Sequence, residues 1–278
     1  MLELTAALAQ LALYVGVIVT VGSVVAELTL RASRAGVRRL RQLAVIGAVI
    51  TIIAGAGGLA MLMLRIGGGL DAETFRLVWN TNVGSAAALR VGGAVGVLVC
   101  AIVADKEFGR IARLLAVILV AGSFNYVGHG AALSEAGGFA AALHVTLAGW
   151  WVGCLFALRA VYAHEPIDDY AHLVARFSRL AVVAITLMLI AGITLVFWLA
   201  PQPFAFTPYV QWLSVKVAFA LGALGIASYN KLRLTPRVAA KDAAAAKTLD
   251  RAIVAELIAI TCVLLATAIL TTYHSPDE

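Results

Sequence analysis

Five histidines are the side chains in this sequence best suited to binding a metal ion. Two of them, His129 and His144, lie at equal sequence distances from a short turn near residues 134–138. If antiparallel helices flank that turn, each imidazole lies about 6–8 Å below it, at 1.5 Å of rise per residue. Neutral imidazole suits copper, zinc, iron or nickel, so the spacing predicts a shared metal site, with packing as the alternative.

A third histidine extends this candidate site. His274 follows the last apolar run of the chain and is expected at the same membrane face as His129 and His144. His164 and His172 lie instead in a polar connector, where we expect solvated side chains.

Sulfur and aromatic side chains near the same face are candidate accessory members. Met61 and Met63 could offer thioether sulfur, but residues two apart on a helix point to nearly opposite sides, so at most one can join. Trp151 lies seven residues after His144, on the same helix face, and is expected to cover the site or to pack against lipid.

Charged residues within apolar segments form a second group of candidates, because they are costly in a membrane and usually face the protein interior. We expect Lys216 and Arg90 to reach the nearby interface, or to pair with an acid or tune the outer cavity. Glu27 is expected to reach the interface, to pair with Arg31 four residues on, or to form an inner exit site for a cation. Glu256 is expected to pair with a cation of the adjoining connector.

The elements that must position these residues are membrane-spanning helices. Of the 278 residues, 62% are hydrophobic and 13% charged, whereas soluble domains average about 45–50% and about 25%. This excludes an ordinary cytosolic enzyme, a disordered protein and a nucleic-acid-binding domain. Eight apolar runs have the length of about 20 residues that a spanning helix needs. They are 6–29, 42–64, 85–104, 111–133, 139–162, 177–199, 209–230 and 252–273. We therefore predict an all-α integral membrane protein, with one transmembrane domain (1–278) of eight helices in a single bundle.

The positive charges predict the orientation of this bundle. Seventeen of the 21 Lys and Arg residues fall in or beside the connectors on one side, against two on the other. Because cytoplasmic loops are rich in Lys and Arg, both termini are expected outside, in the periplasm. The protein is then a multi-pass protein of a bacterial inner membrane with the lipid bilayer around it. The net charge of +6 lies in short loops and does not indicate a nucleic-acid partner.

Motifs for catalysis are missing from the sequence. It has three cysteines without a C-x-x-C pair, and no nucleotide-binding loop, His-Glu-x-x-His, nucleophile elbow or paired catalytic carboxylate. We expect no enzymatic activity, and any transport is expected to run downhill or on a gradient or partner.

Several short motifs give a more specific indication. They are GHGA (128–131), ALHV (142–145), GWWVG (149–153), RFSRLA (176–181), AG (191–192), Tyr209 with Lys216, and YNKLRLTP (229–236). In these motifs the chain resembles the copper resistance protein D family, from about residue 80 to 272 and most specifically between 125 and 236. Two departures are Cys154, where the family commonly has Gly, and His274, which lies beyond the matched pattern.

The resemblance implies an eight-span inner-membrane protein that takes up copper from the periplasm, alongside a small periplasmic copper-carrier protein. It implies that His129 and His144 are the outer copper ligands. The leading prediction is therefore a copper-binding transport protein whose metal ligands are His129, His144 and His274. An all-imidazole set of ligands favours Cu(II) over Cu(I).

Two alternatives remain open at this stage. Paired histidines on neighbouring helices also bind haem, as in a b-type electron-transfer protein. The protein could instead be a partner that delivers copper for assembly of a cuproenzyme.

Overall fold

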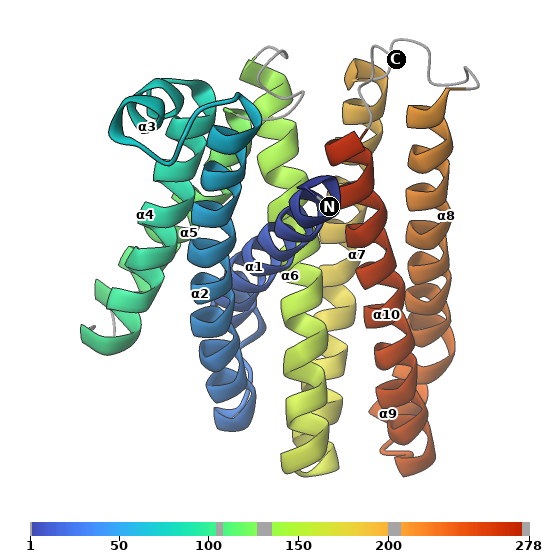
Figure 1. Cartoon of the computed structure of the whole chain (residues 1–278). Helices are drawn as coiled ribbons and strands as arrows, with labels where there is room; N and C mark the ends of the chain where they lie inside the picture. Colours follow the sequence, from blue (N-terminus) through green and yellow to red (C-terminus); the bar gives the residue numbers. More distant parts are fainter. Residues whose placement is uncertain (1, 104–107, 127–134, 200–206, 274–278) are drawn as a thin grey trace.

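The computed structural model describes residues 2–103, 108–126, 135–199 and 207–273, and every regular element in these ranges is helical. The long helices run side by side in a bundle (Figure 1). In chain order the elements are α1 (Leu2–Leu30), α2 (Arg34–Arg65), α3 (Ala72–Trp79), α4 (Asn82–Val103), α5 (Phe108–Gly122), the 3-10 helix η1 (Ser123–Asn125), α6 (Glu135–His164), α7 (Ile167–Leu199), α8 (Pro208–Tyr229), the π-helix η3 (Asn230–Leu234), α9 (Thr235–Ala239) and α10 (Ala243–Tyr273).

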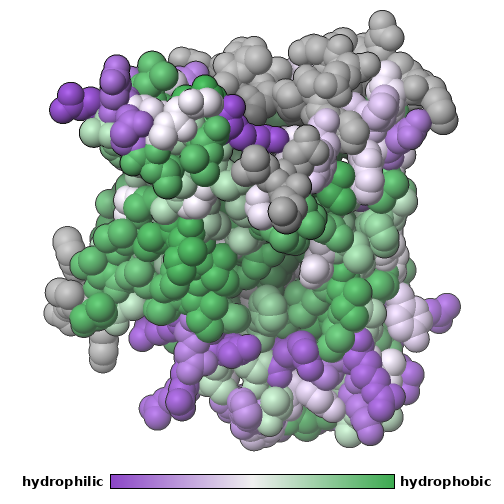
Figure 2. Space-filling view, viewed as in Figure 1, coloured by the Kyte–Doolittle hydropathy of each residue, from purple (hydrophilic) through white to green (hydrophobic). Residues whose placement is uncertain are grey.

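Within the described ranges, seven helical segments are long and apolar enough to cross a membrane. They are α1, α2, α4, α6, α7, the continuous segment from α8 to α9, and α10. Figure 2 shows a hydrophobic band across the middle of the molecule, with hydrophilic residues below it and at the upper left. The chain is therefore a multi-pass membrane protein. In the remaining expected span, 111–133, the part that the structure describes contains α5 and η1, and α5 alone has only 15 residues.

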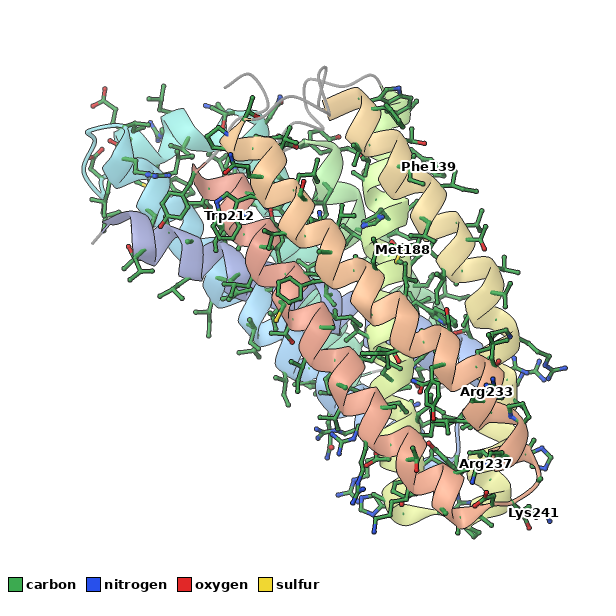
Figure 3. The ribbon with its side chains drawn as sticks, turned by 90° about the vertical axis from the view of Figure 1, so that its right-hand side faces the viewer. Phe139, Met188, Trp212, Arg233, Arg237 and Lys241 are labelled. Atoms are coloured by element: carbon green, nitrogen blue, oxygen red, sulfur yellow. The ribbon has the colours of Figure 1, made fainter. Side chains whose placement is uncertain are left out.

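Several helices are longer than the apolar runs that predicted them. Helix α2 begins at Arg34, α7 at Ile167 and α10 at Ala243, so cations expected in connectors lie on helix ends. Hydropathy detects only the lipid-facing part of a helix, while Arg, Lys and Ala are good helix formers that continue it beyond that part. We call the end that carries these residues the cation-rich end. Figure 3 shows Arg233, Arg237 and Lys241 there, with Phe139 and Trp212 toward the opposite end.

Helices α1 and α2 cross through two matching pairs of small residues. A β-carbon added at Gly16 would lie 2.7 Å from the backbone nitrogen of Thr51, and one at Gly47 would lie 2.7 Å from that of Thr20. Each threonine hydroxyl donates a hydrogen bond to the glycine carbonyl four residues earlier, at 2.7 Å for Thr20 and 2.9 Å for Thr51. The hydroxyls are thereby satisfied within their own helices, and the two backbones can approach closely.

Helices α1 and α6 approach each other backbone to backbone at glycines. Gly149 and Gly153, one turn apart on α6, face Gly22 of α1. A β-carbon at Gly153 would lie 2.5 Å from the carbonyl carbon of Gly22, and one at Gly149 would lie 3.1 Å from its backbone nitrogen. This is the small-xxx-small geometry that lets membrane helices pack backbone to backbone.

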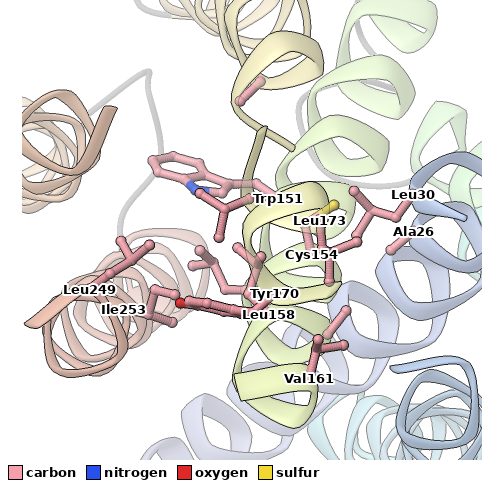
Figure 4. Close-up of a cluster of buried hydrophobic side chains, with 14 of the residues drawn as sticks. Ala26, Leu30, Trp151, Cys154, Leu158, Val161, Tyr170, Leu173, Leu249 and Ile253 are labelled. Atoms are coloured by element: carbon pink, nitrogen blue, oxygen red, sulfur yellow. The ribbon is translucent and has the colours of Figure 1, made fainter. Parts of the chain in front are cut away.

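The buried apolar side chains form two large clusters. The first joins the end of α1 to α6, α7 and the segments from α8 to α10, and it includes Trp150, Trp151 and Cys154. Figure 4 shows part of it, with Leu158 of α6 between Ile253 of α10 and Leu30 of α1. The second cluster joins α1, α2, α4 and α5. Helix α1 contributes to both clusters.

The predicted pairing of Glu27 with Arg31 is wrong. Glu27 accepts hydrogen bonds from Arg41 of α2 at 2.9 Å and from Arg113 of α5 at 2.7 Å, in place of Arg31. Arg31 has a positive φ of 50° and ends α1 instead of continuing it, which removes the i, i+4 geometry. Glu27 therefore ties three helices together at the cation-rich end, where we had considered a cation exit site.

Candidate metal site

His144 lies on α6 with its ring orientation fixed by α7. Its Nδ1 is 2.9 Å from the carbonyl oxygen of Met188. A carbonyl oxygen can only accept, so Nδ1 carries the hydrogen and donates it. In this tautomer the lone pair on Nε2 is free to bind a metal ion, and a hydrogen bond from the other ring nitrogen is the usual support of a ligating histidine.

Gly192 makes room for this ring. A β-carbon at Gly192 would lie 3.0 Å from Cε1 and 3.1 Å from Nδ1 of His144. Gly192 also lies one turn after Met188 on α7, so the bonded carbonyl and the space for the ring belong to one stretch of helix. The AG motif at 191–192 thus has a local role beside the histidine.

Among the candidate accessory residues, Lys216 of α8 interacts electrostatically with His144 of α6. Met63 is 5% exposed and Met61 only partly buried, as their two-residue spacing on α2 requires. Met63 is thus a buried core residue of α2.

The other two predicted ligands, His129 and His274, lie outside the described residues. The elements that lead to them do converge. Tyr14 of α1 stacks on Phe124 of η1, with ring centroids 6.5 Å apart, and its hydroxyl is 3.0 Å from the Thr271 hydroxyl of α10. Tyr14 therefore joins the segment five residues before His129 to the segment three residues before His274.

Arg90 is buried in this same region and does not reach an interface. It is 9% exposed, its Nε donates to the Ser123 hydroxyl at 2.8 Å, and its guanidinium carbon lies 4.9 Å from the centre of the Phe124 ring. The cation–π contact and the hydroxyl take the place of the acid that we had considered as partner.

Trp151 does not cover the histidine. Its indole N–H donates to Glu256 of α10 at 2.6 Å, and the Asn230 amide donates to the other carboxylate oxygen at 3.0 Å. The prediction that Glu256 pairs with a cation of the adjoining connector is therefore wrong. Glu256 lies one and a half turns into the helix beyond Arg251 and faces α6 and η3.

Several residues of the quoted motifs join helices near the cation-rich end. Arg176 donates two hydrogen bonds to the Thr29 carbonyl, at 3.0 and 2.9 Å, and the Trp150 indole donates to the Thr29 hydroxyl at 2.8 Å. Lys231 donates to the carbonyl and the hydroxyl of Ser178, both at 3.1 Å. These contacts therefore hold α1, α6, α7 and η3 together, while ALHV and AG supply His144 and Gly192.

No group of three or more His, Cys, Asp or Glu side chains that could hold a metal ion occurs among the described residues. Of the histidines described, His144 is partly buried, while His164 and His172 are exposed, as expected for the connector. Within the part of the chain that the structure describes, His144 therefore does not belong to a group of three or more such side chains.

Comparison with known families decides the relationship. A family model described as "Copper resistance protein D-like, N-terminal domain" matches residues 1–139, and one described as "Copper resistance protein D" matches residues 171–270. The chain belongs to the copper resistance protein D family. No match was found among curated proteins or among solved structures. The family and the helices together identify a copper-resistance-related membrane protein.

Two functional features of the site were not predictable from residue types. The Met188 carbonyl is a main-chain group, so nothing in the sequence marks it as the partner of His144. Gly192 was noticed only as part of a motif, and its role depends on which helix packs against α6.

Proposed function

We propose that this member of the copper resistance protein D family binds copper at its outer face and moves it into the membrane domain, without catalysing a reaction. The observation that carries the proposal is the 2.9 Å hydrogen bond from His144 Nδ1 to the Met188 carbonyl. It selects the tautomer in which Nε2 can donate its lone pair to a metal ion.

Lys216 of α8 is not among the proposed ligands, because its ammonium charge would repel a copper ion.

His129 and His274 are the proposed further ligands. The contacts of Tyr14 with Phe124 and Thr271 support this set, because they draw together the segments that precede both histidines. Asn125 and Gly138 lie in contact as well, which brings η1 to the start of α6. Three imidazoles would favour Cu(II).

The proposed topology has eight spans with both termini outside. Helix α5 and η1 together measure about 28 Å, at 1.5 Å per α-helical and about 2 Å per 3-10 residue, close to the hydrocarbon thickness of about 30 Å. The cation-rich end would then face the cytoplasm of a bacterial inner membrane. A small periplasmic copper-carrier protein is the proposed donor of copper to the outer face.

Metal analysis of the purified protein tests the site. We expect His144→Ala and His129→Ala to lose bound copper, whereas His172→Ala, an exposed histidine on α7, keeps the wild-type stoichiometry. Gly192→Leu, which fills the space of the ring, should weaken copper binding about 10- to 100-fold, the usual effect of losing the support of a metal ligand. Unchanged copper binding in both the His144 and His129 variants would refute the site.

Two further measurements separate the alternatives. A Soret band in the absorption spectrum of the pure protein would indicate haem. Copper uptake into vesicles that contain only this protein supports transport, whereas uptake only after adding a cuproenzyme or assembly factor would support a delivery role.

A further inference from the structure

Glu256 is a buried carboxylate without a cationic partner among the described residues. It lies inside the apolar helix α10 and is 2% exposed. Its two oxygens accept hydrogen bonds from the neutral Trp151 indole and Asn230 amide, and no Lys, Arg or His nitrogen lies within ion-pair distance of them in the part described. A negative charge in this position is costly unless a cation or a proton accompanies it.

Beside Glu256, the amide of Asn230 has an oxygen atom without a hydrogen-bond partner. Asn230 is 7% exposed, and this oxygen, Oδ1, is buried. Asn230 begins the π-helix η3, which precedes Pro236; proline lacks an N–H and displaces the carbonyl four residues earlier, so the helix widens. The widened turn leaves the Asn230 amide facing Glu256 with one acceptor oxygen still available.

Both residues line a cavity of about 200 Å³ between α6, α7, α8, η3 and α10. Its walls are mainly apolar, with the hydroxyls of Ser178, Thr186 and Ser228 among them. The cavity is large enough for several water molecules, which need polar partners such as these.

Charged groups around the cavity do not neutralise Glu256. Lys231 of η3 is the other charged side chain in the cavity wall, and its ammonium is held by Ser178 of α7. On the side of α6, Arg159 pairs with Asp250 of α10 at 3.0 Å, outside the cavity wall. Helix α7 contributes apolar and hydroxyl side chains to the cavity but no charge.

We propose that Glu256 is a proton-binding site that exchanges its proton with water in this cavity, and that the Asn230 amide turns over between the two protonation states. In the charged state, Asn230 Nδ2 and Trp151 Nε1 donate to the carboxylate, as the structure shows. On protonation, one oxygen gains an O–H bond, the proton coming from a hydronium ion that leaves a water molecule behind.

The asparagine suits this exchange because its amide carries a donor and an acceptor at nearly equivalent positions. Half a turn of the amide places Oδ1 where Nδ2 was, so that it accepts from the new carboxyl O–H. The Trp151 N–H remains a donor to the other oxygen in both states. The carboxyl group of Glu256 therefore has hydrogen-bond partners whether or not the proton is present.

Infrared spectroscopy of the purified, metal-free protein tests the proposal, independently of the copper site. We expect a carboxyl C=O band that appears on lowering the pH from about 8 to about 5 and shifts in D₂O. Glu256→Gln should abolish this band, while Glu27→Gln, a membrane glutamate paired with two arginines, should keep it. Trp151 fluorescence should change with the same midpoint in the wild type and should lose that change in Glu256→Gln.

The wild-type spectrum alone can overturn the proposal. A wild type without any pH-dependent carboxyl band would mean that Glu256 does not exchange a proton in this range. Persistence of the band in Glu256→Gln would assign it to another residue. If Glu256→Gln does not fold, Asn230→Leu, which keeps the carboxylate but removes the amide, should move the midpoint of the wild-type titration, and an unmoved midpoint would contradict the role of Asn230.

Discussion

The contact of Gly153 with Gly22 gives a quantitative test of the α1–α6 crossing. In Gly153→Ala the added methyl carbon would lie 2.5 Å from the Gly22 carbonyl carbon, which is far inside van der Waals contact. The obstacle is backbone, so no side chain can rotate away and the two helices must separate. Overpacking of this kind costs about 1–3 kcal/mol. We expect Gly153→Ala to be destabilised by this amount.

Gly222 on α8 provides the matched control, because a β-carbon there meets nothing within 4 Å. Gly222→Ala should be neutral or more stable by up to about 1 kcal/mol, the helix preference of Ala over Gly. The two variants should therefore differ by about 1–4 kcal/mol, or roughly 2–16 °C in Tm at about 2–4 °C per kcal/mol. Thermal unfolding in detergent, followed by near-UV circular dichroism, measures the difference. Equal Tm values for Gly153→Ala and Gly222→Ala would refute the backbone contact.

Two more predictions concern ion pairs and a helix cap. Glu27 and Arg113 are 10% and 12% exposed, so Arg113→Gln should cost about 1.5–3 kcal/mol, the value of a hydrogen bond to a charged group, because Glu27 keeps only the exposed Arg41 as its ion-pair partner. Arg159→Gln, at a more exposed pair, should cost about 1 kcal/mol or less, and equal effects in denaturant titrations would contradict this. Asp71 caps α3, and hydrogen bonds from Thr74 and then Glu73 lower the pKa of its carboxyl. Because the pKa of Asp71 is lower in the folded form, the ionised carboxylate stabilises that form above the unfolded pKa of about 3.9. This stabilisation is lost as the pH falls through the folded pKa. The hydrogen-exchange protection factors of α3, which divide the intrinsic exchange rate at each pH by the observed rate, should therefore fall at acid pH in the wild type and lose this pH dependence in Asp71→Asn, which keeps a cap that does not titrate.

The membrane class of the fold was predictable from hydropathy, because the length of an apolar run is set by the bilayer. Helix ends were not predictable in this way. The run at 42–64 becomes a helix from Arg34, because the polar first turns of α2 do not register as apolar. Helix α3 lies where a connector was expected. Its start is fixed by the N-cap Asp71, and hydropathy does not detect capping residues.

The candidate site was predictable in its residue types but not in its contacts. His144 was identified by its spacing, and its neutral tautomer emerged only with the Met188 carbonyl in place. Glu256 was assigned to a nearby cation because charges usually pair, yet it pairs with Trp151 and Asn230. Trp151 and Asn230 lie 105 and 26 residues from Glu256 in the sequence, and local sequence patterns do not predict contacts over such separations.

The two crossings of α1 impose an order on its assembly during biosynthesis. The α1–α2 crossing joins consecutive helices, so it can form as soon as this hairpin has entered the bilayer. Gly22, in contrast, finds Gly149 only after a further stretch of more than a hundred residues, which takes about 6–25 s to synthesise at 5–20 residues per second. Until then the face of α1 that carries Gly22 lies against lipid or the insertion machinery, and the bundle stays incomplete until α6 has been inserted.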